Sequence, residues 1–308
     1  MKLLTFLKAR ERSSRASTSV RRTTRYSSAA MKLRAESIPA LSIHAVPMRT
    51  DVETLAAVLS SAGFIAADEE AAQLVACADG DVELLDSLVA RRLTGEPLAW
   101  ITGGVLFCGL EIHVDPGVYV PRWHSEPLAR RAAERLPASG VAVDVCTGSG
   151  AIARTMSAHH PRARVVATDI DPRAVACATT NGVEVYCGDL FAPLPRTLEG
   201  RVEVVVGVVP YVPTPELPLL QRDTFTFESA LSYDGGRDGT DVLRRVVTDS
   251  PRFLRLGGAL LLELGGKQAD VLDDELTRRG YVDVTVLADE EGDVRGIEAT
   301  LEKRGRHR

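Results

Sequence analysis

The sequence has no apolar run near the ~20 residues that a transmembrane helix needs, so it predicts no membrane-spanning helix and no membrane partner. Aromatic residues are scarce at 5%, but apolar residues make up 45% and charged residues 26% of the 308 positions, a composition typical of globular proteins. The five cysteines include no C-x-x-C pair, and no H-x-x-x-H spacing occurs. We therefore expect no disulfide scaffold and no metal site, and a reducing, cytoplasmic compartment fits best.

Basic residues are concentrated at one end of the chain. The first 50 residues hold 11 Lys and Arg against two Asp and Glu, whereas the rest holds 26 against 40. Residues 1–50 are rich in Ser, Thr and Arg with almost no apolar periodicity, which predicts a disordered basic tail. The composition of this segment also matches a mitochondrial transit peptide, and Met31 and Met48 are alternative starts. The remaining acidic body predicts no stable nucleic-acid partner.

Three regions are predicted after this tail. Leucine and valine at helical spacing predict about three helices within residues 51–100, and β-favouring residues around Cys108 and Gly109 predict a β-hairpin linker within residues 101–120. In residues 121–308 strands alternate with helices, which is typical of a doubly wound α/β sheet covered on both faces. The strands are predicted at residues 141–145, 164–168, 184–186, 202–206, 259–263, 282–287 and 297–301, and the helices at 151–159, 172–180, 241–254 and 267–279. The last two strands are close in sequence and predict an antiparallel edge.

A turn of small residues follows the first of these strands and reads Asp144-Val145-Cys146-Thr147-Gly148-Ser149-Gly150. Such a turn lets a ligand approach the backbone closely, and ligands of open α/β sheets bind at the carboxyl ends of the strands. The turn lacks the G-x-G-x-x-G pattern of nicotinamide dinucleotide sites. It resembles instead the S-adenosylmethionine motif D-x-G-x-G-x-G, with Cys146 in place of the first glycine.

Two further acids follow the next two strands. Asp169 lies 19 residues after Gly150, where a carboxylate accepts hydrogen bonds from ribose hydroxyls. Asp189 follows the third strand, at a position suited to an adenine amine, with Leu190 against the ring. Three acids after three successive strands predict S-adenosylmethionine as the cofactor. The predicted cofactor residues are Asp144, Cys146, Thr147, Gly148, Gly150, Asp169, Ile170, Asp189 and Leu190.

Several longer segments match one family. They are Arg92 to Leu98, Phe107 to Leu110, Val114 to Val118, Val120 to Arg122, Phe227-Glu228, Ala230-Leu231, Gly235 to Leu243 and Leu256 to Gly258. By these segments the chain resembles the bacterial protein N5-glutamine methyltransferases that modify class I release factors, and more closely still a related group of uncertain substrate. The resemblance covers about residues 51–303. It implies a seven-stranded, Rossmann-like class I methyltransferase sheet over residues 121–308, docking of a release-factor-like protein by the helical region, and a monomer.

The acceptor motif of that family is altered in this chain. The family's fourth strand ends in Asn-Pro-Pro-Tyr, and the matching residues here are Val208, Val209, Pro210 and Tyr211. In the family the Asn oxygen and a backbone carbonyl accept the two N–H bonds of the substrate amide, which orients the nitrogen lone pair, and the Tyr covers the amide plane. Val208 has no side-chain acceptor, and loss of one such hydrogen bond costs about 100- to 1000-fold in rate.

The sequence therefore predicts an S-adenosylmethionine-dependent protein glutamine methyltransferase whose acceptor pocket is formed by residues 208–211. Val208 keeps two alternatives open. One is a methyltransferase of a different acceptor, a small molecule or a nucleobase amine. The other is a protein that binds S-adenosylmethionine without catalysis.

Overall fold

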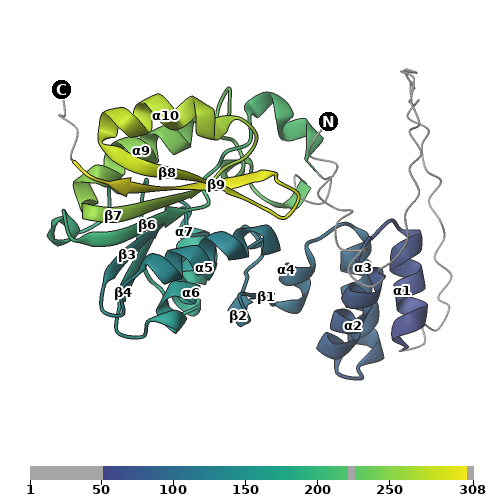
Figure 1. The fold of residues 1–308 in the computed structure, drawn as a ribbon. Coiled ribbons are helices and arrows are strands. Elements are labelled where there is room, and N and C mark those ends of the chain that lie inside the picture. Colours follow the sequence, from purple (N-terminus) through teal and green to yellow (C-terminus); the bar gives the residue numbers. More distant parts are fainter. Residues whose placement is uncertain (1–50, 221–225, 304–308) are drawn as a thin grey trace, which may run out of the picture. The chain divides into compact units, whose positions relative to one another are not determined.

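The computed structural model describes residues 51–220 and 226–303 (Figure 1). The predicted basic tail, residues 1–50, lies outside the described residues. Within the described ranges no helix is long and apolar enough to cross a membrane.

The described chain begins with three helices, α1 (Val52–Ser61), α2 (Ala67–Ala78) and α3 (Val82–Leu93). Asp51 and Asp81 cap α1 and α3, because their carboxylates accept hydrogen bonds from the backbone N–H groups of Thr54 at 2.7 Å and Leu84 at 2.9 Å. The apolar faces of these helices share one core, which contains Leu55, Leu59, Leu74, Leu85, Leu88 and Val89. The three helices predicted from the apolar spacing are confirmed.

A short helix that the sequence did not predict follows, α4 (Leu98–Thr102). Pro97 stands just before its first turn, where a proline is tolerated. The side chain of Ile101 packs in the core of α1–α3, whereas Trp100 packs in the core beside the large sheet and donates its indole N–H to the Val118 carbonyl at 2.9 Å. Helix α4 thus spans the boundary predicted at residue 100 and contributes to both cores.

The predicted hairpin is present as β1 (Gly104–Phe107) and β2 (Leu110–His113), which pair antiparallel. Cys108 and Gly109 form its turn with φ angles of 50° and 79°. Both angles lie in the left-handed region that glycine adopts readily and cysteine rarely does.

A seven-stranded sheet follows the hairpin, in the order β5-β4-β3-β6-β7-β9-β8 (Figure 1). Its strands are β3 (Val141–Val145), β4 (Arg164–Asp169), β5 (Glu184–Cys187), β6 (Val202–Gly207), β7 (Leu254–Glu263), β8 (Tyr281–Ala288) and β9 (Val294–Leu301). The first five strands in this order, β5, β4, β3, β6 and β7, are parallel to one another. Strand β9 is antiparallel to both of its neighbours, β7 and β8. The predicted class I methyltransferase sheet with an antiparallel edge is confirmed.

Strand β7 begins five residues earlier than predicted. The strand runs through Gly257-Gly258, with a shift of register against β6 between Val202 and Val204. A side chain at Gly258 would approach the Val202 carbonyl oxygen to 3.0 Å, so the irregular pairing requires a small residue there.

Helices cover both faces of the sheet, as predicted. On one face lie α5 (Glu126–Arg135), α6 (Ala151–His159) and α7 (Pro172–Thr180), and on the other α9 (Asp241–Phe253) and α10 (Gln268–Arg279). Successive residues of β6 alternate between the two cores, with Val204 and Val206 on the side of α5 and Val205 on the side of α9. Short 3₁₀ turns complete the described chain: η3 (Trp123–Ser125), η4 (Arg196–Leu198), η5 (Thr214–Leu219) and η6 (Ala230–Ser232).

Helix α5 was missed in the sequence, although its signal is present. Its buried residues Leu128, Ala129, Ala132 and Ala133 recur at helical spacing, and Pro127 stands in its first turn, where the missing N–H costs no helical hydrogen bond.

Candidate active site

The centre of the sheet brings together two loops that are about 60 residues apart in sequence. Strands β3 and β6 are parallel neighbours, and the chain leaves them toward opposite edges of the sheet, with β4 and β5 on one side and β7 on the other. The turn after β3 and the segment after β6 therefore meet at the same edge, which is where open α/β sheets bind ligands.

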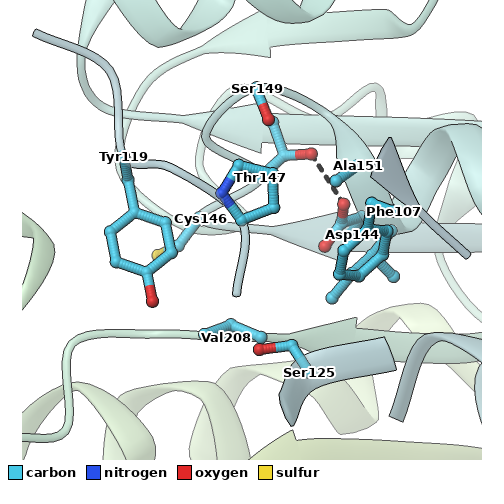
Figure 2. Close-up of a pocket in the computed structure, with 11 residues that line it drawn as sticks. Phe107, Tyr119, Ser125, Asp144, Cys146, Thr147, Ser149, Ala151 and Val208 are labelled. Carbon is cyan, nitrogen blue, oxygen red and sulfur yellow. Dashed lines mark hydrogen bonds between the residues drawn. The ribbon is translucent and has the colours of Figure 1, made fainter. Parts of the chain in front are cut away.

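A pocket lies between these loops (Figure 2). It is lined by Phe107, Tyr119, Pro121, Ser125, Asp144, Cys146, Thr147, Ser149, Ala151, Ile152 and Val208. Among the predicted residues, Asp144, Cys146, Thr147 and Val208 are thus in one pocket. Two of the others, Phe107 and Tyr119, come from residues 101–120, which the sequence predicted to be a linker, and Pro121 and Ser125 follow directly after it.

One carboxylate oxygen of Asp144 accepts hydrogen bonds, and the other has no partner among the described residues. Its Oδ2 accepts hydrogen bonds from the Thr147 hydroxyl at 2.6 Å and the Ala153 backbone N–H at 3.1 Å. Its Oδ1 is buried and has no hydrogen-bond partner within the described part of the chain. Burial raises the pKa of Asp144 to about 7, although these two hydrogen bonds oppose the shift. A buried, unpaired carboxylate oxygen at a glycine turn is suited to a cationic ligand group.

The turn after β3 holds a left-handed backbone at three positions. Cys146, Gly148 and Gly150 have φ angles of 56°, 57° and 83°. A side chain at Gly150 would come within 2.8 Å of Val183, so this position also needs glycine for space. Cys146 is left-handed although it is not a glycine, and burial raises the pKa of its thiol.

Asp169 fastens this turn to the end of β4. One of its oxygens accepts the Gly148 N–H at 2.8 Å and the other accepts the Asp171 N–H at 2.9 Å. Each oxygen keeps a lone pair for a further donor. Burial raises the pKa of Asp169, with the two backbone hydrogen bonds opposing that shift.

The remaining predicted cofactor residues differ in accessibility. Ile170 is 57% exposed beside Asp169, and Asp189 is half-exposed and paired with Arg245 at 2.5 Å. Leu190, predicted to lie against an adenine ring, is only 5% exposed and packs in the core on the α9 face. Of the two aliphatic residues in this predicted set, Ile170 is therefore the one exposed enough to contact an adenine ring.

The segment after β6 is held by contacts with β7 and α10. Val209 is buried, whereas Val208 faces the pocket. The Tyr211 hydroxyl donates to Glu263 Oε1 at 2.9 Å, and the Tyr211 carbonyl accepts the Gln268 amide N–H at 2.7 Å. These two hydrogen bonds fix both the ring and the backbone of Tyr211.

Gly239 packs against this segment, and substituting it tests how tightly the two are packed. A side chain there would lie 2.2 Å from the Tyr211 carbonyl oxygen, and its φ of 75° is left-handed. Gly239→Ala should lower the free energy of unfolding by about 1–2 kcal/mol more than Gly292→Ala, because overpacking adds to backbone strain. Gly292 is a matched control, with φ of 82° and no atom within 4 Å of the added carbon. Equal losses in denaturant titrations would contradict this account.

A buried carboxylate that the sequence analysis did not single out, Glu228, holds another wall of the pocket. Glu228 accepts hydrogen bonds from the Val120 N–H at 2.8 Å and the Arg122 guanidinium at 2.6 Å, and the Tyr233 hydroxyl also donates to it. The residues on either side of Val120, Tyr119 and Pro121, line the pocket. Arg122 and Glu228 both lie in segments that carry the family resemblance, and that resemblance is the sequence feature that could have pointed to them.

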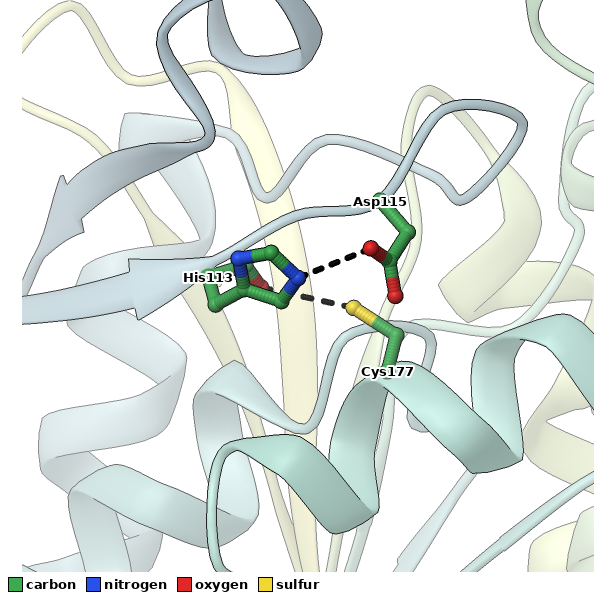
Figure 3. A group of neighbouring side chains, drawn as sticks. All are labelled: His113, Asp115 and Cys177. Carbon is green, nitrogen blue, oxygen red and sulfur yellow. Dashed lines mark hydrogen bonds and ion pairs between the residues drawn. The ribbon is translucent and has the colours of Figure 1, made fainter.

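One group of potential metal ligands occurs among the residues described, His113, Asp115 and Cys177 (Figure 3). Their ligand atoms lie within 4.8 Å of one another, and His113 Nε2 is 2.8 Å from Asp115 Oδ1. The Cys177 thiol donates to the His113 carbonyl at 3.4 Å, and burial raises its pKa to about 11. Asn181 donates to the same carbonyl at 2.8 Å, so these contacts fasten the hairpin to α7.

Comparisons with known proteins place the chain among methyltransferases. A family model described as methyltransferase small domain matches residues 110–190. The chain is 35% identical to a release factor glutamine methyltransferase of Mycolicibacterium smegmatis over 276 residues, 82% of this chain and 97% of that protein. It is 36% identical to one of Geobacter sulfurreducens over 211 residues, 67% of this chain and 73% of that protein. The hMettl16 catalytic domain, solved with a MAT2A 3′UTR hairpin, is 15% identical with a TM-score of 0.50 over 72% of this chain and 84% of that one, a likeness of fold alone.

Proposed function

The chain belongs to the release factor glutamine methyltransferase family and is an S-adenosylmethionine-dependent methyltransferase, and we propose that its acceptor is a glutamine side chain of a class I release factor. The similarity over 82% of the chain to a relative of that name carries the proposal. In the reaction the amide nitrogen gains the methyl group, the bond between that methyl and the cofactor sulfur breaks to leave a neutral thioether, and one amide proton is released to solvent.

The predicted residues fit the cofactor. S-Adenosylmethionine supplies an electrophilic methyl group bound to a sulfonium, and it also carries an ammonium and a ribose. The unpaired, buried Oδ1 of Asp144 suits the ammonium, and the free lone pairs of Asp169 suit the ribose hydroxyls. Ile170 offers apolar surface for the adenine, and Asp189 stands at the same edge of the sheet. Gly148, Gly150, Cys146 and Thr147 form the turn, and Leu190 belongs to the core on the α9 face.

The acceptor pocket is assigned to residues 208–211. An amide nitrogen is a weak nucleophile, so the pocket acts by orienting the amide and by excluding water. The Val209 carbonyl accepts one amide N–H, and Pro210 fixes the backbone beside it. The ring of Tyr211 covers the amide plane, and its hydrogen bond to Glu263 holds that ring in place. Phe107 and Val208 supply apolar walls.

The same proposal covers the roles of the N-terminal regions, the oligomeric state and the cellular compartment. The helical region, residues 51–100, docks the protein substrate, and the hairpin region, residues 101–120, joins it to the methyltransferase domain. The protein acts as a monomer in the cytoplasm, without a stable nucleic-acid partner.

Transfer of tritiated methyl groups tests the proposed function. The purified full chain is incubated with labelled S-adenosylmethionine and a purified class I release factor, and the label is mapped after proteolysis. Label on one glutamine is the expected result. Because Val208 is apolar, the second candidate is a different acceptor, which label in a small-molecule or nucleic-acid fraction of a cell lysate would favour. Cofactor binding without any transfer would instead favour a non-catalytic protein.

Asp169→Asn should weaken S-adenosylmethionine binding about tenfold, because hydrogen bonds to a charged acceptor are about twice as strong as neutral ones. The asparagine keeps one oxygen for the Gly148 N–H, but it loses the acceptor of the Asp171 N–H and the charge that the ribose hydroxyls would meet. Asp51→Asn is the control, since Asp51 also accepts a backbone N–H but caps α1. Titration calorimetry measures both, and equal affinities in the two variants would place the ribose elsewhere.

A further inference from the structure

We propose that the Ser125 hydroxyl accepts a hydrogen bond from the glutamine side-chain amide, the contact that Val208 cannot make. This assignment rests on the proposed function and names a second catalytic contact within the same pocket. The observations that carry it are the conformation, the burial and the location of Ser125.

Ser125 stands at a helix start but does not cap the helix. It is the residue before α5, where a serine hydroxyl normally accepts a hydrogen bond from a backbone N–H of the first turn. Here its φ and ψ are −85° and −11°, and its side chain makes no capping hydrogen bond. The ordinary local reason for a serine at this position is therefore missing.

The hydroxyl is instead turned into the pocket. Ser125 is 3% exposed, and its Oγ has no hydrogen-bond partner among residues 51–220 and 226–303. A buried hydroxyl without a partner is costly unless a ligand supplies one. Ser125 and Val208 line the same pocket, and in Figure 2 the Ser125 oxygen is directed toward the side where Val208 lies.

The other unpartnered polar atoms do not offer the same contact. Asp144 Oδ1 lines the pocket, but its charge and its place beside the glycine turn suit the cofactor ammonium. Glu263 Oε2 and Thr168 Oγ1 are also buried without partners in the described ranges, but neither residue lines the pocket. Of these four unpartnered atoms in the described ranges, Ser125 Oγ is thus the neutral acceptor on a residue that lines the pocket.

A hydroxyl suits the role chemically. The amide presents two N–H donors, one of which the Val209 carbonyl takes, and a serine oxygen has two lone pairs for the other. Holding both N–H bonds fixes the direction of the nitrogen lone pair, on which methyl transfer depends. Apolar Val208 then leaves Ser125 as the side-chain acceptor for the second N–H bond.

Single-turnover methyl transfer to a purified class I release factor tests the assignment. Ser125→Ala should slow transfer about 10- to 30-fold with the dissociation constant of S-adenosylmethionine changed less than twofold. In the Val208→Asn background the same substitution should cost at most about threefold, because the new amide oxygen takes over the contact. Ser250→Ala is the control, since Ser250 is also a buried hydroxyl but bonds to Val246 and Tyr281 outside the pocket.

The outcomes separate this assignment from the function on which it rests. If the wild-type chain binds the cofactor but methylates no glutamine, the proposed function fails and the assignment fails with it. If the wild type methylates glutamine and Ser125→Ala is equally fast, only the assignment is overturned. A loss of cofactor affinity that matches the loss of rate would also overturn it, because Ser125 would then act on the cofactor.

Discussion

Val208→Asn is expected to raise the rate of methyl transfer to a glutamine side chain by about tenfold to 100-fold. Val208 lines the pocket beside the turn after β3, so a longer polar side chain there reaches the amide rather than the core. The new carbonyl oxygen accepts an amide N–H with better directionality than a serine hydroxyl. Cofactor affinity should be nearly unchanged, because the predicted cofactor residues lie at the ends of β3, β4 and β5 and not in the segment after β6.

Two comparisons test the interpretation of this result: the Val208→Ala variant and an assay on a methyl acceptor that is not an amide. The alanine variant shortens the side chain without adding an acceptor, so it should give no gain. If the natural acceptor is not an amide, Val208→Asn should instead slow methylation of that acceptor, since it places an unpaired polar group in an apolar wall. The two hypotheses predict opposite signs for one variant, and a lower rate on glutamine would contradict the assignment of the pocket.

Asp144→Asn is expected to weaken S-adenosylmethionine binding about 100-fold at pH 8, because it removes a charge-assisted hydrogen bond to the cofactor ammonium. An asparagine oxygen can still accept from Thr147 and Ala153, so the turn should keep its shape. Calorimetry measures the affinity. An unchanged dissociation constant would show that the free Oδ1 serves another partner.

The pH dependence of binding provides a second measurement on the same group. The pKa of Asp144 is raised to about 7 by burial, so the free protein is largely protonated there at pH 6 and largely ionised at pH 8. Because the ammonium binds the ionised form, affinity should rise with pH over this window and level off above it. The Asn variant should lose this rise.

The same shift has a consequence for stability. The unfolded chain releases the Asp144 proton near pH 3.8, whereas the folded chain retains it to about pH 7. Between these values the folded state binds more protons, so this group lowers stability as pH rises through the window. The melting temperature of Asp144→Asn relative to wild type should therefore be higher at pH 8 than at pH 5. The opposite trend would contradict the assigned direction of the shift.

The sequence determined the architecture because the architecture depends on local patterns. Runs such as Val202–Gly207 are long enough for one buried strand, and their alternation with amphipathic segments specifies a doubly wound sheet. The acid and glycines after β3 were recognisable because a left-handed turn at a strand end requires particular residues. Two elements were incompletely predicted, since helix α4 was missed and strand β7 begins five residues earlier than expected.

Only the tertiary structure decided which side chains are free to act. Glu228 lies 108 residues from Val120, whose backbone it holds, and Leu190 follows a predicted cofactor acid but is taken into the core. Asp144 Oδ1 and Ser125 Oγ are distinguished by having no partner among the described residues. Hydrogen-bond satisfaction and burial are set by neighbours that folding brings from distant segments, and no spacing along the chain records them.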